Sequence, residues 1–107
     1  MKTTITRAEL KQLIDNKENL MILDVRSKEE YLEKYIPFAG NLPIEIIEAG
    51  NFIPEPKKTI ITVCGKGGGR SERAANFLRE HNKNEVYFLE GGTFEWLSRD
   101  NNSKERI

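Results

Sequence analysis

The chain alternates short apolar runs with short amphipathic segments, and this alternation is what most constrains its fold. Apolar runs lie at residues 20–25, 59–63 and 85–89, and the second is β-branched at every position. Such runs are typical of strands that are covered on both faces. Strands that alternate with helices favour a mostly parallel sheet, and ligands of such sheets bind beyond the carboxyl ends of the strands. We therefore predict an α/β fold with its site at that edge.

Two capping boxes mark where helices begin. In the segment 6–9, Thr6 and Glu9 can satisfy each other's backbone N–H groups, which predicts a helix over residues 7–15. The segment 27–30 repeats this pattern with Ser27 and Glu30 and predicts a helix to about Lys34. Further helical segments are expected at 44–49, 71–80 and around 94–97.

Length and charge exclude several classes of protein. At 107 residues and 12.3 kDa the chain is expected to form one domain over residues 1–107, with a polar tail from about residue 98 that frays. The 17 basic and 17 acidic residues give a net charge of zero, so we expect neither a nucleic-acid partner nor a membrane surface. No signal peptide or spanning segment is apparent, and we expect a cytoplasmic protein. The sequence sets no oligomeric state, and it is consistent with a monomer.

The single cysteine limits the chemistry. One Cys and one His exclude an internal disulfide and a structural zinc site, and we expect neither metal nor cofactor. A free cysteine at a strand end is most often a small buried hydrophobe. The residues that follow Cys64 favour a reactive thiolate instead.

Those residues form a glycine-rich loop, Cys64-Gly65-Lys66-Gly67-Gly68-Gly69-Arg70-Ser71, which holds four of the chain's eight glycines. Glycine permits positive φ, so successive N–H groups can converge on an anion in front of the next helix. Arg70 can add a bidentate donor and Lys66 a positive charge. The same donors would lower the pKa of Cys64. We therefore predict Cys64 as the nucleophile and residues 65–71 as the substrate-binding loop.

Two other glycine-loop motifs do not match. A Walker A loop needs Ser or Thr after Gly-Lys, and Gly65-Lys66 is followed by Gly67. In a dinucleotide-binding fingerprint counted from Gly65, the third glycine would fall at residue 70, which is Arg. The loop therefore matches neither of these nucleotide-binding motifs.

A set of motifs spread over residues 20–97 resembles the rhodanese superfamily. The motifs, in order, are Asp24-Val25-Arg26, Glu30-Tyr31, Ile36-Pro37, Asn41-Leu42-Pro43, Cys64 with Arg70-Ser71, and Leu89-Glu90-Gly91-Gly92 with Trp96. The resemblance implies a rhodanese fold, with a mostly parallel five-stranded sheet and helices on both faces. It also implies a sulfurtransferase in which Cys64 accepts sulfane sulfur from thiosulfate or a persulfide and passes it to a nucleophile.

The loop departs from the commonest sulfurtransferase pattern. Cys64 to Arg70 occupies seven positions, whereas that pattern has six, and seven resembles the dual-specificity phosphatases and arsenate reductases of the same fold. Those enzymes typically place His before the cysteine, where this chain has Val63. The usual Gly-His before Ile-Pro is Lys34-Tyr35 here, and Phe38 replaces the usual Gly.

The sequence is therefore consistent with three functions. We favour a sulfurtransferase that uses a Cys64 persulfide; a phosphatase or arsenate reductase and a non-catalytic rhodanese-like binding module are the alternatives. Because the chain has no second cysteine, an external thiol or another acceptor, such as a thioredoxin-like protein, must resolve any adduct. Asp24 and Arg26 are expected to form a structural ion pair that supports the site.

Overall fold

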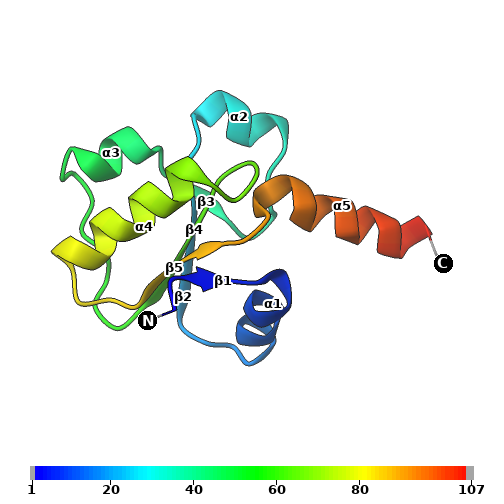
Figure 1. The fold of residues 1–107 in the computed structure, drawn as a ribbon, viewed down its shortest axis with the longest axis horizontal. Helices are drawn as coiled ribbons and strands as arrows, with labels where there is room; N and C mark the ends of the chain where they lie inside the picture. Colours follow the sequence, from blue (N-terminus) through cyan, green and yellow to red (C-terminus); the bar gives the residue numbers. More distant parts are fainter. Residues whose placement is uncertain (1, 106–107) are drawn as a thin grey trace.

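The protein is an α/β domain built on one five-stranded sheet. The computed structural model describes the backbone of residues 2–105 and the side chains of residues 2–99. The strands are β1 (Thr4–Ile5), β2 (Leu20–Asp24), β3 (Gly40–Asn41), β4 (Thr59–Val63) and β5 (Val86–Leu89). Every pair is parallel, and the spatial order is β1-β5-β4-β2-β3. Figure 1 shows the strands in the middle of the molecule, with helices around them.

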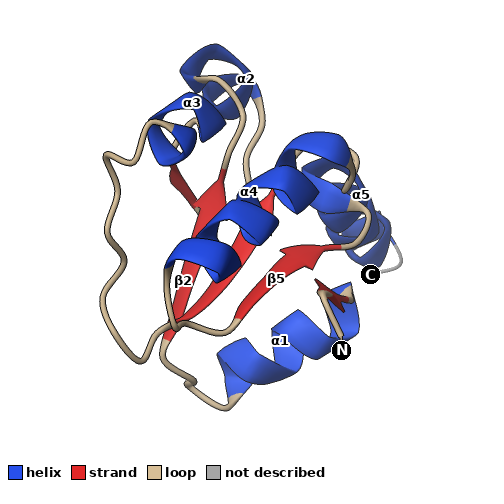
Figure 2. Ribbon diagram, turned by 60° about the vertical axis from the view of Figure 1, so that its left-hand side comes forward, coloured by secondary structure: helices blue, strands red, loops and turns tan. Residues whose placement is uncertain are grey.

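Helices cover both faces of the sheet. They are α1 (Arg7–Asp15), α2 (Lys28–Glu33), α3 (Ile44–Glu48), α4 (Gly69–His81) and α5 (Gly92–Glu105). Side chains of α3 and α4 form one apolar core with the sheet, and side chains of α1 and α5 form a second core with its other face. Figure 2 shows α4 lying across the strands. The predicted arrangement, a mostly parallel five-stranded sheet with helices on both faces, is confirmed.

Local sequence signals placed most of these elements correctly. Thr6 and Ser27 both form complete capping boxes, with Glu9 and Glu30 respectively, and α1 and α2 begin where those boxes predict. The three apolar runs form β2, β4 and β5. None of the described helices has the length and apolar character needed to cross a membrane.

Two helices differ from the predicted bounds. The structure begins α4 at Gly69, two positions earlier than expected, because the N–H groups of Ser71 and Glu72 already bond to the carbonyl of Gly68. Gly69 and Arg70 therefore belong to the first turn of α4 instead of the loop. Helix α5 is longer than the short segment expected and takes in most of the polar tail.

The register between β2 and β4 determines where along the sheet the site lies. Asp24 pairs with Val63, so β2 and β4 end side by side at the carboxyl edge. The residue after β4 is Cys64, and the segment after β2 leads into α2. Residues from two separate parts of the chain therefore meet at this edge.

Candidate active site

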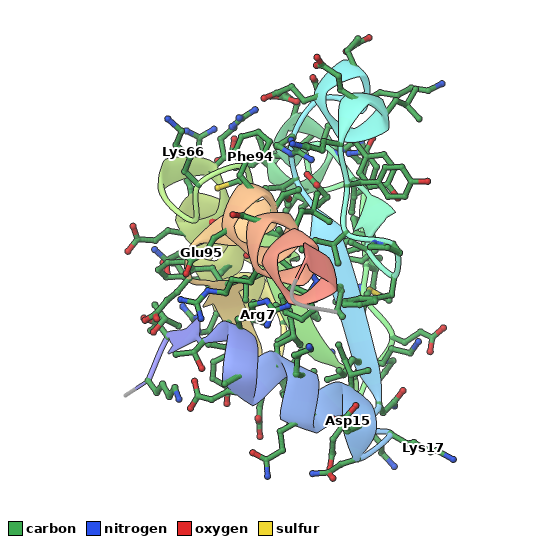
Figure 3. The ribbon with its side chains drawn as sticks, turned by 90° about the vertical axis from the view of Figure 1, so that its right-hand side faces the viewer. Arg7, Asp15, Lys17, Lys66, Phe94 and Glu95 are labelled. Carbon is green, nitrogen blue, oxygen red and sulfur yellow. The ribbon has the colours of Figure 1, made fainter. Side chains whose placement is uncertain are left out.

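Cys64 lies at the carboxyl end of β4, with 5% of its surface exposed. An open pocket reaches it and is lined by Glu30, Cys64, Gly65, Lys66, Gly68, Gly69, Arg70 and Phe94. Figure 3 shows Lys66 and Phe94 together at this end of the molecule, far from Asp15 and Lys17 at the opposite end. The pocket therefore lies at the edge of the sheet that the topology predicts.

The Cys64 sulfur is surrounded by polar groups of the loop and of the first turn of α4. Its Sγ lies 3.2 Å from the Ser71 hydroxyl and donates to the Gly68 carbonyl at 3.3 Å. The Ser71 hydroxyl donates to the same carbonyl at 2.9 Å. Once the thiol has lost its proton, the Ser71 hydroxyl can turn to donate to the sulfur.

These contacts lower the pKa of the Cys64 thiol below its ordinary value. Burial is the largest single influence and acts to raise the pKa. The Ser71 hydroxyl, together with the backbone N–H groups of Ser71, Gly68 and Gly67, outweighs it. The local structure therefore favours a thiolate at this position.

Strand β4 also holds Ser71 in place. The Thr62 hydroxyl donates to the Ser71 carbonyl at 2.7 Å, and neither residue is exposed to solvent. This bond fixes the first turn of α4 against the strand that carries Cys64. The Cys64 sulfur and the Ser71 donors are thus held next to each other.

The first turn of α5 holds the other side of the loop. The N–H groups of Thr93 and Phe94 donate to the carbonyls of Cys64 and Gly65, at 2.9 and 3.1 Å. Because these loop carbonyls bond to α5, they satisfy N–H groups that the helix itself leaves free.

Backbones approach closely where the loop meets α5. Gly67 and Gly92 have φ of +77° and +63°, the region that favours glycine. A Cβ atom on Gly92 would lie 2.4 Å from the Cys64 carbonyl oxygen, and one on Gly67 would lie 2.4 Å from the Gly91 nitrogen. Glycine is therefore required at both positions by space as well as by conformation.

Asp24 and Arg26 form the predicted ion pair beside this loop. The shortest link joins Arg26 Nη2 to Asp24 Oδ2 at 2.8 Å, and both residues are almost fully buried. Arg26 also donates to the Lys34 carbonyl at 2.6 Å, and its guanidinium lies 5.6 Å from the centre of the Phe94 ring. Neither charged residue lines the pocket, so the pair braces the segments around the site.

Arg70 has a partner that the sequence did not suggest. Its Nη1 and Nη2 bond to Oε1 and Oε2 of Glu30 at 2.7 and 3.0 Å. From the sequence, Glu30 was expected only to cap α2, and Phe94 was expected to be a core or pocket-wall residue, which agrees with its place in the pocket lining. The contacts of Gly92 and Thr93 with the Cys64 carbonyl were missed. The one available signal was that Glu30 and Gly92 lie within the resemblance motifs.

The remaining predicted site residues have distinct positions. Lys66 and Gly69 are exposed and line the pocket, whereas Gly67 is half-buried, Ser71 is buried, and neither of these two lines it. Among the side chains that the structure describes, no group of three or more His, Cys, Asp or Glu is placed to hold a metal ion.

Comparison with known proteins gives matches over most of the chain. The family model for the rhodanese-like domain matches residues 6–99. The thiosulfate sulfurtransferase GlpE of Pseudoalteromonas translucida is 31% identical over 104 residues, which covers 95% of each protein. The putative sulfur carrier protein YrkF of Bacillus subtilis is 32% identical over 96 residues, or 89% of this chain. This chain spans about half of the length of that Bacillus protein, 51%.

Solved structures have the same fold. A rhodanese-like domain protein from Staphylococcus aureus is 32% identical, with a TM-score of 0.72 over 90% of this chain and 91% of that one. A human single-domain sulfurtransferase is 23% identical and has a TM-score of 0.79 over 92% and 97% of the two chains, which supports the fold alone. On the family match and these likenesses, the chain belongs to the rhodanese-like domain family.

Proposed function

We propose that the protein is a sulfurtransferase that carries sulfane sulfur on Cys64 as a persulfide. The observation that carries the proposal is the setting of the Cys64 sulfur, with its lowered pKa and its ring of N–H and O–H donors at the base of an open pocket. Relatives named as sulfurtransferases support sulfur transfer in general. Thiolate character is what this reaction needs, because the thiolate is the nucleophilic form of cysteine.

The proposed reaction has two steps. The Cys64 thiolate attacks the outer sulfur of the donor, the donor's S–S bond breaks, and sulfite or a thiolate leaves with the electron pair. Cys64 then carries a persulfide, whose terminal charge can be stabilised by the N–H groups of Gly67, Gly68 and Ser71. In the second step an acceptor nucleophile takes the terminal sulfur, and the Cys64 thiolate is released. Because the chain has one cysteine, that acceptor is an external thiol, a thioredoxin-like protein or another external nucleophile.

The phosphatase or arsenate reductase alternative rests on the seven-position loop from Cys64 to Arg70. Phosphate ester hydrolysis also needs a general acid for the leaving group, with a pKa near the working pH. The carboxyl group that lines the pocket is Glu30, and its pKa is lowered to about 2, first by Arg70 and then by the Ser27 N–H. Glu30 is therefore ionised near neutral pH and a poor acid. This observation favours sulfur transfer over phosphate ester hydrolysis.

A non-catalytic binding module is the third possibility. Such a module needs no nucleophile, and the lowered pKa of Cys64 would then serve no purpose. We therefore rank it below both enzymatic functions.

A side-by-side assay tests the proposal. Purified protein is given thiosulfate or glutathione persulfide with a thiol acceptor, and separately an aryl phosphate or arsenate with a reducing thiol. We expect sulfur transfer by the wild type, at least about a hundredfold above Cys64→Ser, because the variant lacks the nucleophile. Turnover of aryl phosphate or arsenate without sulfur transfer would overturn the proposal.

A further inference from the structure

Glu30 and Arg70 form a bidentate ion pair at the mouth of the pocket. Glu30 belongs to α2 and Arg70 to the first turn of α4, so the pair joins two of the three helices that line the opening. Their side chains are 42% and 41% exposed, and both line the pocket that contains Cys64. Two N–H groups that an anion could use are therefore already bound to a carboxylate.

The Glu30 carboxylate is held in this position from its own helix. Its Oε1 accepts from the backbone N–H of Ser27 at 3.2 Å and from the Ser27 hydroxyl at 3.0 Å. For Glu30 to leave Arg70, it would have to turn within this capping box or break it. The capping box of α2 thus holds the Glu30 carboxylate in place to pair with Arg70 before a ligand binds.

The pair between Glu30 and Arg70 reduces the positive charge that the pocket offers to an incoming anion. The charged side chains that line the pocket are Glu30, Lys66 and Arg70. With Cys64 as a thiolate, two negative groups face two positive ones. Both negative groups, the Cys64 thiolate and the Glu30 carboxylate, would repel a doubly charged anion. The guanidinium of Arg70 would attract it less strongly, because that group is already paired with Glu30. The reacting end of an organic persulfide, –S–SH or –S–S⁻, carries at most one negative charge, so it needs less positive charge inside the pocket and can use the backbone N–H groups.

We propose that Glu30 is a specificity-determining residue, which disfavours tetrahedral dianions at Cys64 and so favours organic persulfides over thiosulfate as sulfur donors. This inference deepens the proposed function and rests on it for the identity of the donor. The electrostatic part does not depend on sulfur transfer and can be tested separately. In the donor step, the Cys64 thiolate attacks the outer sulfur of R–S–SH, and R–S⁻ leaves with the electron pair.

The variant Glu30→Gln removes the charge and keeps the local fold, because glutamine also serves at this position of a capping box. The matched control is Glu9→Gln. Glu9 occupies the same capping-box position in α1 and also pairs with a lysine, Lys2, but it does not line this pocket. Glu30→Ala is a second variant, which should change the readouts in the same direction.

The first readout is alkylation of Cys64 by iodoacetate and by iodoacetamide, which have similar shapes but differ in charge. For Glu30→Gln we expect the ratio of the iodoacetate rate to the iodoacetamide rate to rise about threefold, because one negative charge near the sulfur is lost. We also expect inorganic sulfate to protect Cys64 at about fivefold lower concentration. Glu9→Gln should match the wild type in both measurements.

A ratio and a sulfate protection that do not change in Glu30→Gln would overturn the inference, as would equal changes in Glu9→Gln. A merely structural role for Glu30 would alter both alkylation rates together and leave their ratio constant. These measurements need no sulfur donor, so they can succeed even where the proposed sulfur transfer fails.

The second readout compares donors. In Glu30→Gln, kcat/KM for thiosulfate relative to kcat/KM for glutathione persulfide should rise about fivefold, mainly through a lower KM for thiosulfate. A wild type that prefers thiosulfate, with a preference that Glu30→Gln does not change, would contradict the inference while leaving sulfur transfer itself established.

Discussion

Ser71 is the side chain that contributes most to the thiolate at Cys64. Its hydroxyl is the largest of the influences that lower the pKa of the thiol, and its own N–H comes next. The residue is buried, and its carbonyl is bound to Thr62. Ser71 is therefore held in a fixed position next to the Cys64 sulfur. A substitution can remove its hydroxyl and leave its backbone N–H in place.

We expect Ser71→Ala to raise the pKa of Cys64. The backbone N–H groups remain, but one donor to the charged sulfur is lost. A hydrogen bond to a charged group contributes about 1.5 kcal/mol, so alkylation by iodoacetamide at pH 7 should slow by up to about tenfold. The measurement is the alkylation rate of Cys64 against pH, and its midpoint should move to higher pH.

The matched control is Ser98→Ala, at an exposed serine of α5, which should leave the midpoint where it is. If the midpoint of Ser71→Ala stayed at the wild-type pH, the hydroxyl would have no part in stabilising the thiolate.

At this scale, the sequence predicted the nucleophile but not its full surroundings. Cys64 stood out because half of the glycines lie in the loop after it. The partner of Arg70 was not predicted, because Glu30 lies 40 residues away in the chain and its capping box already gave it a local role. A side chain with two partners, one of them distant, cannot be found from local patterns.

Two helix N-termini hold the loop from opposite sides. The first turn of α4 directs donors toward the Cys64 sulfur, while the first turn of α5 binds the carbonyls of Cys64 and Gly65. Gly92 lies where α5 begins, and its backbone is in close contact with the loop. The contact between loop and α5 therefore depends on the absence of a side chain at this residue.

We expect Gly92→Ala to destabilise the fold and the site together. The new Cβ would lie 2.4 Å from the Cys64 carbonyl oxygen and 2.6 Å from the Gly67 nitrogen, at a φ of +63°. Backbone strain of this kind costs about 1–3 kcal/mol, and relief of the contact would move the loop. Thermal or urea unfolding should show the loss, and Cys64 alkylation should slow.

The control is Gly40→Ala in β3, where a Cβ would have no neighbour within 4 Å. We expect it to change the unfolding free energy by less than about 1 kcal/mol. Equal stabilities for the two variants would show that the close contact between α5 and the loop is not needed.

Element boundaries were predictable where a side chain marks them. The capping boxes of Thr6 and Ser27 gave the starts of α1 and α2, whereas α4 begins at a glycine with no side-chain cap and was predicted two residues late. Strands β1 and β3 have two residues each, too few for a periodic pattern. They are strands only because β5 and β2 pair with them.

In the molecule as a whole, the site lies between β2 and β4, where the direction in which successive strands are added to the sheet reverses. From β2 the chain passes to β3 on one side, and then to β4 and β5 on the other. In parallel sheets, such a switch point opens a crevice at the carboxyl edge. Glu30 follows β2 and Cys64 follows β4, so the crevice brings together the carboxylate, Arg70 and the thiol. The sequence predicted this edge, but the switch point also depends on β3, which no pattern revealed.

Intact-mass measurement after incubation with glutathione persulfide shows whether Cys64 carries the transferred sulfur. We expect wild-type protein to gain the mass of one sulfur atom, dithiothreitol to remove it, and Cys64→Ser to gain none. Absence of the adduct from the wild type, or its appearance on Cys64→Ser, would contradict the claim that Cys64 carries the sulfur.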